Sequence, residues 1–265
     1  MLDKQARYWD SVAQAWQEEH PQALWRVHSD AIYSALFGQW LPDHPVPRLL
    51  KTDLFDETCS QGLYPLLASR ARAVIGTDVA TLTVRAARSR HSDLMGMEAD
   101  VRRLPFADGT FDVIVSNSTL DHFHSLDQVI VGLAELYRVL ASGGQLLLSL
   151  DNLANPAIAV RNALPSRLME RLRTIVPYYV GATCGPGRLQ RMLRQVGFDV
   201  LEVTALMHHP SVLAVAVARL LQRRASPAIR KRFLRLLMSL EHLSRLPTRF
   251  VTGHYVVVRA VKRVS

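Results

Sequence analysis

The stretch that decides the fold is "EADVRRLPFADGTFDVIVSNSTLDHF" (98–123), followed closely by "LAELYRVLASGGQLLLSLDN" (133–152). Each contains a short apolar run, "FDVIVSNS" (111–118) and "QLLLSLDN" (145–152), of the length typical of a buried strand. Between the runs, the segment 128–140 repeats its apolar residues at helical spacing. The order of strand, helix and strand predicts parallel strands whose connecting helices cover the faces of the sheet.

The same alternation continues on both sides of this stretch. The further apolar runs are "RLLKTDLF" (48–55), "AVIGTD" (73–78), "DLMGMEAD" (93–100), "DVLEVTAL" (199–206) and "GHYVVVRAV" (253–261). Seven such runs, separated by segments long enough for helices, predict an α/β fold with a mostly parallel sheet. Ligands of such sheets bind beyond the carboxyl ends of the strands, where the loops converge.

Two of the loops carry residues suited to a nucleoside. The second run ends in Asp78, which lies 22 residues after Asp56 in the turn "DETCSQG" (56–62). A turn after the first strand with an acid about 20 residues further on is the arrangement in which backbone amides approach a ligand and a carboxylate accepts hydrogen bonds from ribose hydroxyls. The other interpretation of Asp78 is an exposed carboxylate at a strand end.

The segments "ADVRRLPFADGTFDVIVSNSTLDH" and "LAELYRVLASGGQLLLSL" resemble the class I methyltransferases that use S-adenosylmethionine, in particular the broad small-molecule family of methyltransferase type 11. The resemblance covers about residues 48–151. It implies a Rossmann-like sheet of seven strands flanked by helices, and S-adenosylmethionine as cofactor. It also implies that a helix near the N-terminus covers the cofactor. No metal site is expected, because the sequence has no cluster of Cys and His ligands.

The resemblance assigns cofactor-binding positions residue by residue. The family's D-x-G-x-G-x-G turn, with its frequent cysteine, falls on Asp56, Thr58, Cys59, Ser60 and Gly62. The ribose-binding acid falls on Asp78 with Val79 beside it, the adenine neighbours on Asp100 and Val101, and the end of the fourth strand on Ser116 and Asn117.

This chain departs from the family in that turn. Thr58 and Ser60 stand where the family has glycine, and glycine there admits positive φ and a close backbone approach to the ligand. A β-branched residue at positive φ would be strained, yet both residues are small and can form hydrogen bonds to nearby amides. Two interpretations therefore remain: a re-tuned cofactor turn, or a weakened or lost cofactor site.

The loop "STLDHFHS" supplies candidates for a catalytic base. Asp121, His122 and His124 follow the fourth strand, and His122 coincides with a histidine of the family pattern. A base is needed only if the acceptor must lose a proton near neutral pH. His122 could instead pack against the cofactor or cap a helix, and His124 could be an exposed loop histidine. A histidine pair at 208 and 209 is a further candidate, or only a polar junction.

The positive charge of the chain is concentrated near its end. The net charge is +9, but from Met207 onward there are 12 basic residues and one acid, whereas Met1 to Leu206 carry 20 basic and 22 acidic residues. We expect one methyltransferase-like core (1–206 and 248–265, with 1–45 as an N-terminal helical cover). We expect residues 207–247 to form a basic helical insertion or lid of two helices.

The composition of the insertion indicates which kinds of partner the protein could bind. The helices of the insertion combine an apolar stripe with arginines, which suits a membrane surface or a channel for a lipid-like substrate. The alternative is a lid whose apolar face covers the active site and whose arginines are only solvated. Nucleic acid is not favoured, because the basic residues lack the interleaved aromatics of a stacking platform. The sequence gives no indication of oligomeric state.

These observations predict transfer of the S-adenosylmethionine methyl group to a small apolar or lipid-like acceptor, with oxygen favoured over carbon or nitrogen as the acceptor atom. The alternative is a catalytically weak or inactive binding or scaffold protein with a degenerate cofactor turn. Cys59 and Cys184 form no disulfide framework or metal cluster, and neither a signal peptide nor a spanning helix is recognised. A cytoplasmic location, with peripheral membrane contact as an option, is expected.

Overall fold

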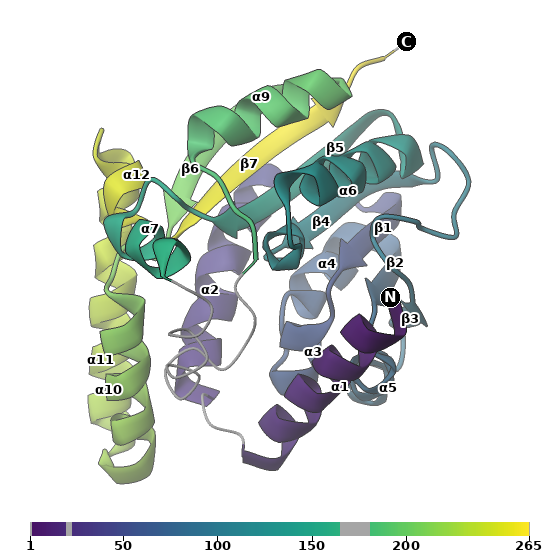
Figure 1. Cartoon of the computed structure of the whole chain (residues 1–265). Coiled ribbons are helices and arrows are strands. Elements are labelled where there is room, and N and C mark those ends of the chain that lie inside the picture. The colour runs from purple at the N-terminus through teal and green to yellow at the C-terminus, as the bar shows by residue number, and fades with distance from the viewer. Residues whose placement is uncertain (1, 20–22, 165–180, 265) are drawn as a thin grey trace.

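A computed structural model describes residues 2–19, 23–164 and 181–264. Its centre is a seven-stranded sheet in the order β3-β2-β1-β4-β5-β7-β6, in which β7 runs antiparallel to its neighbours. The strands are β1 (Val46–Thr52), β2 (Ala71–Asp78), β3 (Met95–Glu98), β4 (Phe111–Asn117), β5 (Leu140–Asp151), β6 (Phe198–Leu206) and β7 (Tyr255–Lys262). The predicted seven-stranded, mostly parallel α/β sheet is confirmed (Figure 1).

Helices cover both faces of this sheet. They are α1 (Leu2–Glu19), α2 (Ala23–Trp40), α3 (Phe55–Cys59), α4 (Tyr64–Arg70), α5 (Thr81–Arg90), η1 (Leu120–His122), α6 (Leu126–Val139), α7 (Pro156–Ala163), α9 (Pro186–Val196), α10 (Ser211–Arg224), α11 (Pro227–Leu240), η2 (Glu241–Arg245) and α12 (Arg249–Thr252). One core cluster lies between the sheet and helices α6 and α9, and a second lies between the sheet and helices α2, α4 and α5.

The alternation of side chains along each strand builds these two cores. In β4, Ile114 joins the cluster under α6, while Val113 and Val115 join the cluster under α2. In β5, Leu146 and Leu148 face the first cluster and Leu147 faces the second, as the two-residue period of a strand requires. A strand buried on both faces has an uninterrupted apolar run, which explains why these runs identified the strands.

The first strand ends earlier than its apolar run predicted. The run 48–55 was expected to be a strand, but β1 stops at Thr52, because Asp53 adopts φ 71° and turns the chain. Phe55 then begins the short helix α3. The segment that resembles the family's glycine turn therefore lies on a helix and the loop after it.

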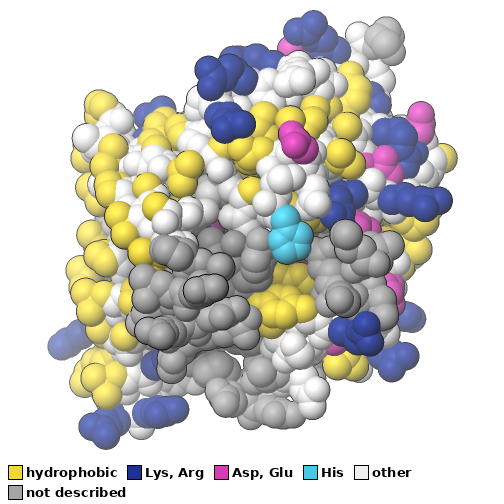
Figure 2. Space-filling model, in the orientation of Figure 1, with side chains coloured by type: hydrophobic (Ala, Val, Ile, Leu, Met, Phe, Trp, Pro, Cys, Tyr) yellow, Lys and Arg dark blue, Asp and Glu magenta, His cyan; other side chains and the backbone are white. Residues whose placement is uncertain are grey.

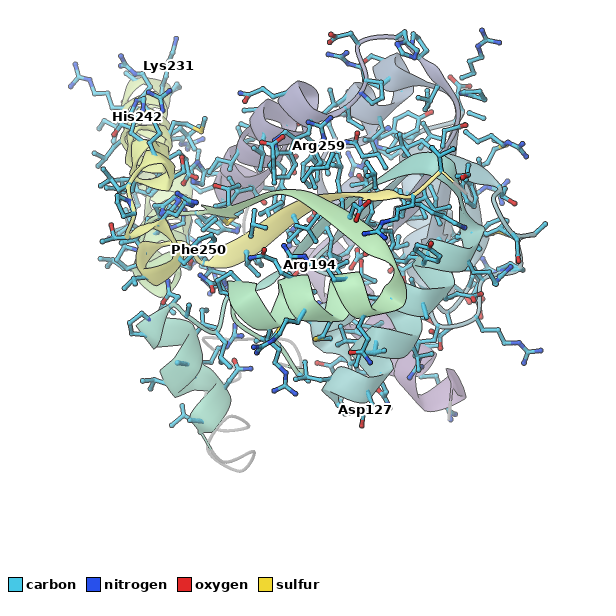
Figure 3. The ribbon with its side chains drawn as sticks, turned by 90° about the horizontal axis from the view of Figure 1, so that it is seen from above. Asp127, Arg194, Lys231, His242, Phe250 and Arg259 are labelled. Atoms are coloured by element: carbon cyan, nitrogen blue, oxygen red, sulfur yellow. The ribbon has the colours of Figure 1, made fainter. Side chains whose placement is uncertain are left out.

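The predicted insertion is present as helices α10 and α11 with η2, packed beside α2. Ser226 occupies the N-cap position of α11 without a capping hydrogen bond from its side chain, and Pro227 is the first residue of the helix. Lys231 and His242 lie at the side of the molecule remote from Asp127 on α6 (Figure 3). Apolar side chains are gathered over these helices at the left edge of the surface shown in Figure 2.

The chain between β5 and α9 is rich in Pro and Asn, and its residues 165–180 lie outside the described residues. Its described parts include α7 and the start of α9. The N-terminal cover is present as α1 and α2. The division into core, cover and insertion stays a prediction, because no comparison tests where one unit ends.

Candidate active site

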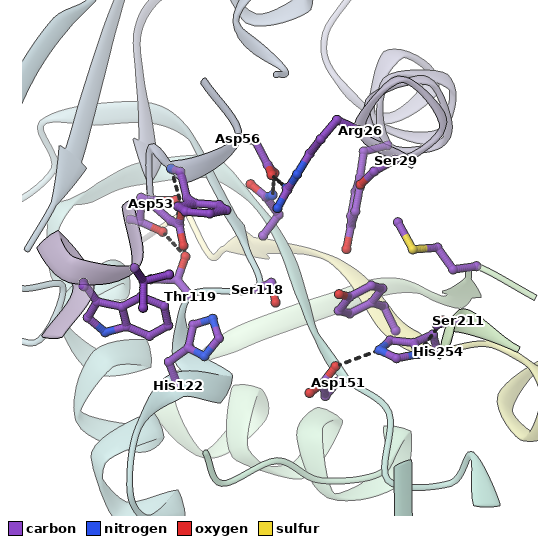
Figure 4. A pocket seen from close by; sticks show the side chains of 18 of the residues that line it. Arg26, Ser29, Asp53, Asp56, Ser118, Thr119, His122, Asp151, Ser211 and His254 are labelled. Atoms are coloured by element: carbon purple, nitrogen blue, oxygen red, sulfur yellow. Dashed lines mark hydrogen bonds and ion pairs between the residues drawn. The ribbon is translucent and has the colours of Figure 1, made fainter. Parts of the chain in front are cut away.

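A cavity of about 720 Å³ lies at the carboxyl ends of the parallel strands. Strands β1, β2, β4 and β5 each end at its wall, with Asp53, Asp78, Asn117 and Asp151 at or next to their last residues. Helices α1, α2, α7 and α10 complete the wall, and Figure 4 shows the labelled side chains around the space. We call the part beside Asp53, Asp78 and Asp100 the cofactor half and the part lined by α7 and α10 the acceptor half.

The structure shows which backbone conformation Thr58 and Ser60 adopt in the turn after β1. Among the described non-glycine residues, positive φ occurs at Asp53, Ser118 and Met207, and therefore at neither Thr58 nor Ser60. Thr58 Oγ1 donates to the Phe55 carbonyl at 2.7 Å, and Ser60 Oγ donates to the Asp56 carbonyl at 3.0 Å. Both side chains therefore support the helical turn, and the strain expected of a β-branched residue in a glycine position does not arise.

A buried ion pair supports the same turn. Lys51 Nζ lies 3.0 Å from Glu57 Oε2, and the two side chains are 2% and 0% exposed. Glu57 Oε1 also accepts from the Leu63 amide at 2.9 Å. Burial raises the pKa of Glu57 to about 7 although the Lys51 charge acts in the opposite direction. Gly62 has φ 56°, and a Cβ there would lie 2.5 Å from Glu57 Oε1, so this glycine is needed to accommodate Glu57.

Four of the five predicted residues of the turn do not reach the cavity. Thr58, Cys59, Ser60 and Gly62 are absent from its described wall, whereas Asp56, three residues after Asp53, lines it. The physical reason is that α3 turns these residues away from the strand ends. Of the five residues, Asp56 is therefore the one placed to contact a ligand in the cavity, and its role in cofactor binding stays a prediction.

Asp56 belongs to a cluster of polar side chains, in which Arg26 is the member that was not identified from the sequence. Arg26 of α2 forms an ion pair with Asp56, and Asn117 Nδ2 donates to Asp56 Oδ2 at 3.2 Å. The Arg26 guanidinium also lies 5.0 Å from the centre of the Phe55 ring. Asn117 Oδ1 is buried and has no hydrogen-bond partner among the described residues. A buried amide oxygen at a cavity wall is suited to accept a hydrogen bond from a bound ligand.

Asp78 lies where the resemblance predicted it, at the end of β2 and in the wall of the cavity. Its carboxylate accepts from the amides of Leu54 (3.0 Å) and Ala80 (2.8 Å). Burial, and then the nearby Asp53 carboxylate, raise the pKa of Asp78 to about 7. A carboxylate offers about four lone-pair positions, so two remain for the hydroxyls of a ribose.

The adenine neighbours predicted from the sequence also line the cavity. Asp100 is held by Arg102, whose Nη2 lies 2.6 Å from Oδ2, and Val101 and Val79 add apolar wall on either side. This combination of two carboxyl groups and apolar surface suits a nucleoside. At the end of β4, Asn117 lines the cavity but Ser116 does not, because the Ser116 hydroxyl is buried against Thr52 Oγ1 at 2.8 Å.

The three candidate catalytic residues lie in different environments. His122 lines the cavity, and its ring lies 4.6 Å from that of Trp9 of the covering helix α1. Asp121 is buried and accepts from the Asp151 amide (2.9 Å) and the Ser118 hydroxyl (3.1 Å), while burial raises its pKa to about 6. His124 is exposed and lies outside the described wall. A catalytic role for any of them stays a prediction.

The sequence pointed to the insertion 207–247 and the loop after the fifth strand for the acceptor, but it identified no single residue of the acceptor half. Its apolar surface comes from Ala157, Ile158, Val160 and Leu164 in and after α7, from Val212, Val215 and Ala216 of α10, and from Trp25 and Tyr33 of α2. Within it stand three hydrogen-bonded polar groups, Asp151, His254 and Ser211 (Figure 4). The signal that could have found Asp151 is its place at a strand end, which it shares with Asp78.

A scan against family models matched residues 56–148 to a methyltransferase domain. Curated relatives include a probable tRNA methyltransferase 9B of Bos taurus, 29% identical over 55% of this chain and 25% of that protein. A probable S-adenosylmethionine-dependent methyltransferase of Mycobacterium tuberculosis is 30% identical over 43% of each chain. A demethylmenaquinone methyltransferase of Beutenbergia cavernae is 34% identical over 31% of this chain and 33% of its own length. The chain thus spans less than half the length of these relatives.

Solved structures share the fold over most of the chain. The [4+2]-cyclase SpnF superposes with a TM-score of 0.58 at 19% identity, covering 88% of this chain and 80% of its own. A geranyl diphosphate methyltransferase in complex with GPP and sinefungin gives 0.55 at 16% identity, covering 86% and 76%. These similarities confirm the predicted Rossmann-like fold, and the domain match shows that residues 56–148 are similar to a methyltransferase domain.

Proposed function

We propose that this chain is an S-adenosylmethionine-dependent methyltransferase that methylates a small apolar or lipid-like acceptor, with oxygen as the favoured acceptor atom. The similarity of residues 56–148 to a methyltransferase domain supports the first part of the proposal. The observation that carries the proposal is one cavity with two chemically different halves. The cofactor half has acids at the strand ends, and the acceptor half is mainly apolar. A transferase needs both a donor and an acceptor in one water-poor space.

The residues of the cofactor half fit the cofactor. Asp78 would hold the ribose hydroxyls, and Val79 and Val101 would flank the adenine. The guanidinium of Arg26 suits a carboxylate, and the unpartnered Asn117 Oδ1 suits an ammonium group, which are the two charges of the methionine end. The bound cofactor supplies a methyl group already activated by its sulfonium, so the chain's own residues have mainly to align the acceptor and exclude water.

The apolar acceptor class rests on the lining of the acceptor half. Val215 and Ala216 of α10 and Ile158 of α7 offer a surface that hydrocarbon chains or rings can cover. Val212, at the start of α10, lines the cavity and is 61% exposed, so apolar surface continues from the cavity to the outside. The names of two similar proteins, a demethylmenaquinone methyltransferase and a geranyl diphosphate methyltransferase, agree with an apolar acceptor.

Calorimetric titration with S-adenosylhomocysteine tests the donor side. We expect micromolar binding, and absence of binding at high micromolar concentration would contradict the proposal. The acceptor side is tested with radiolabelled S-adenosylmethionine and a set of probes: 4-octylphenol, 1-decanol, 4-octylaniline and a short RNA hairpin. Methylation of the phenol or the alcohol is the expected result, and methylation of the RNA alone would assign the acceptor to a different class.

His122 remains a candidate base within this proposal, with Asp121 and His124 as the other residues predicted from the sequence. His122 faces the cofactor half beside Trp9, which equally fits a role in packing against the cofactor. His122→Ala separates the two roles. A packing role predicts weaker binding of S-adenosylhomocysteine, whereas a base predicts unchanged binding and slower turnover with 4-octylphenol.

A second candidate function is a binding or scaffold protein that keeps the fold. One observation favours it: Thr58, Cys59, Ser60 and Gly62 do not line the cavity. The structural neighbour SpnF, which is named a [4+2]-cyclase, has the same fold under a name that is not a methyltransferase. Binding of S-adenosylhomocysteine without methyl release to any probe would favour this candidate. Methyl release would exclude it.

The insertion supports a proposal of contact with an anionic membrane surface. Residues 207–247 are 41 of the 265, yet of the 17 large apolar side chains exposed in the described chain they hold seven: Val212, Leu213, Leu220, Ile229, Leu236, Met238 and Leu246. The same segment has eight basic residues and one acid. Apolar side chains beside arginines suit insertion among anionic headgroups. No described helix has the length and apolar character required to cross a bilayer.

Sedimentation with vesicles tests this contact. We expect the protein to pellet with phosphatidylcholine–phosphatidylglycerol vesicles at low salt and less with phosphatidylcholine alone. Leu213→Ser with Leu236→Ser should reduce pelleting. Leu201→Ser is the control, at a leucine of β6 that is 52% exposed, against 62% for Leu213 and 59% for Leu236. If the double variant and the Leu201→Ser control pelleted equally, the insertion would not be the part of the protein that contacts the membrane. A cytoplasmic location stays a prediction.

A further inference from the structure

The acceptor half contains a hydrogen-bonded row of three side chains from distant parts of the sequence. His254 Nε2 lies 3.3 Å from Asp151 Oδ1, and His254 Nδ1 lies 2.9 Å from Ser211 Oγ. All three residues line the cavity. Asp151 ends β5, Ser211 begins α10, and His254 precedes β7, so the fold alone brings them together.

The backbone holds the middle residue firmly. The His254 amide donates to the Met207 carbonyl at 3.2 Å, and the His254 carbonyl accepts from the Asn152 amide at 2.8 Å. These two bonds fix His254 between the ends of β5 and β6. The ring also lies 4.6 Å from that of Tyr255. A side chain on such a support can hold one orientation toward a ligand.

The network determines which nitrogen of His254 is basic. Asp151 is bound by Arg161 of α7 as well as by His254. Burial acts to raise the pKa of Asp151, but the hydrogen bond from His254 and the charge of Arg161 hold it below its ordinary value. An ionised carboxylate can only accept a hydrogen bond, so Nε2 carries the proton and Nδ1 presents its lone pair to the Ser211 hydroxyl.

We infer that His254 is the general base for the acceptor, that Ser211 relays the proton, and that Asp151 is the positioning residue behind His254. This inference rests on the methyl transfer proposed above. The acceptor hydroxyl gives its proton to Ser211 Oγ while Ser211 gives its own to His254 Nδ1. The acceptor oxygen keeps the electron pair of its broken O–H bond and uses it to form the new O–CH3 bond. The S–CH3 bond of the donor would break with its electron pair left on sulfur, so that neutral S-adenosylhomocysteine is the leaving group. The imidazolium formed is stabilised by the Asp151 carboxylate.

The placement of His254 favours it over His122 for this role. His122 packs against Trp9 beside the cofactor half, whereas His254 stands between α10 and the end of β5, among the residues of the acceptor half. The charged and titratable groups facing His254 come from each neighbouring element. They are Asp151 at the end of β5, Tyr255 of β7 and His209 before α10. Arg161 of α7 and Asp121 of η1 act on Asp151 behind it.

The first test needs no acceptor. Long-range ¹H–¹⁵N spectra of the histidine rings, recorded at neutral pH with S-adenosylhomocysteine present, report which nitrogen carries the proton. His254→Gln identifies the signal by its loss. We expect the Nε2–H form, and an Nδ1–H form would overturn the inference, because Nδ1 could then not take a proton from Ser211.

The second test uses 4-octylphenol and the more acidic 2-nitro-4-octylphenol. A positioned base contributes about 10²–10⁴-fold, so His254→Gln should lower methylation of 4-octylphenol by at least 100-fold. The defect should shrink to below tenfold with the nitrophenol, which needs less help to lose its proton. Ser211→Ala should lower turnover about tenfold and Ser211→Thr should restore most of it. Turnover of His254→Gln within threefold of wild type would overturn the inference.

Controls separate this inference from the function on which it rests. His242→Gln, an exposed histidine of η2, should behave as wild type. Binding of S-adenosylhomocysteine should stay within twofold in every variant, because these residues lie in the acceptor half. Loss of binding in the wild type would contradict the methyltransferase proposal. Binding without methylation of either phenol would contradict the acceptor class, and the ring spectra would still decide the state of His254.

Discussion

The two halves of the cavity differ in the groups whose pKa is shifted mainly by burial. The cofactor half is built on carboxyl groups, and burial raises the pKa of Asp78 and of the supporting Glu57 to about 7. The acceptor half is supported by a buried histidine pair, His28 of α2 and His209 before α10, whose Nε2 atoms lie 3.1 Å apart. Burial lowers the pKa of His28 to about 4 and that of His209 to about 3.

The same physical cause therefore gives opposite responses to pH. Burial disfavours the charged form of every group, so the acids retain protons to higher pH and the histidines lose theirs at lower pH. Below pH 7 the cofactor half gains stability but loses its ribose-binding charge, whereas the wall of the acceptor half loses stability. Each half can thus be perturbed separately.

The largest effect is expected from the buried ion pair under the cofactor half. Lys51→Met leaves Glu57 without its partner in a site where both side chains are almost completely buried. Breaking a buried pair costs about 3–5 kcal/mol of unfolding free energy, which urea denaturation measures at pH 8. At pH 6 the loss should be smaller, because Glu57 can then take up a proton.

A double variant is the control for this prediction. Adding Glu57→Gln to Lys51→Met removes the orphaned charge and retains an acceptor for the Leu63 amide. It should therefore recover part of the stability. A single variant as stable as wild type would mean that water reaches Glu57 and that the pair is not truly buried.

The next largest effect concerns cofactor binding by Asp78. Hydrogen bonds to a charged group contribute about 1.5–3 kcal/mol, so Asp78→Asn should weaken binding of S-adenosylhomocysteine by about 10–100-fold in calorimetry. Because the pKa of Asp78 is raised to about 7, wild-type affinity should increase as pH rises through 7. Asp53→Asn removes a nearby negative charge and should move this increase to lower pH. A pH-independent affinity would contradict the role of Asp78.

The strand-end residues were predictable because of how parallel sheets are built. Asp56, Asp78, Asp100 and Asn117 were placed by the motif order and by the rule that ligands meet the carboxyl ends of strands, and all four line the cavity. The fold followed from the uninterrupted apolar runs. The path of the chain after β1 was not predictable, since the positive φ of Asp53 leaves no pattern in the sequence.

The acceptor half could not be predicted for a different reason. His254 and Asp151 are about 100 residues apart, and no spacing motif links them to each other or to Ser211. They meet because β7 inserts antiparallel between β5 and β6, which brings His254 to the end of β5. The histidine pair of His28 and His209 likewise depends on α10 packing against α2.

A smaller effect is expected when the pH falls, and it should appear in the acceptor half alone. Below pH 6.5, the ordinary pKa of histidine, His28 binds a proton in the unfolded chain but stays neutral in the folded protein. The stability that neutral His28 contributes above pH 6.5 is therefore lost as the pH falls toward 4. From pH 8 to 5.5 the loss is about 1 kcal/mol. Hydrogen exchange by mass spectrometry should show α10 less protected at pH 5.5, with exchange rates corrected for pH.

His28→Phe is the variant that checks this cause. It removes the titrating group while keeping an aromatic ring beside Trp25, whose ring centre lies 5.6 Å from that of His28. The protection of α10 in this variant should depend less on pH than in the wild type. Equal loss of protection in α4, at the other side of the second core cluster, would show a global effect and would contradict the local one.

The smallest effect is expected from restoring a family glycine to the turn after β1. Ser60 has φ −143°, which any residue can adopt, and it lies outside the cavity wall. Ser60→Gly removes its bonds to the Asp56 carbonyl and the Gly62 amide, so we expect a loss of about 1 kcal/mol in unfolding free energy. Calorimetry should show an affinity for S-adenosylhomocysteine within threefold of wild type. If the glycine instead tightened binding tenfold or more, the turn would have to open toward the cavity when the cofactor binds, and the cofactor half would be less preformed than the contacts of Glu57 and Ser60 indicate.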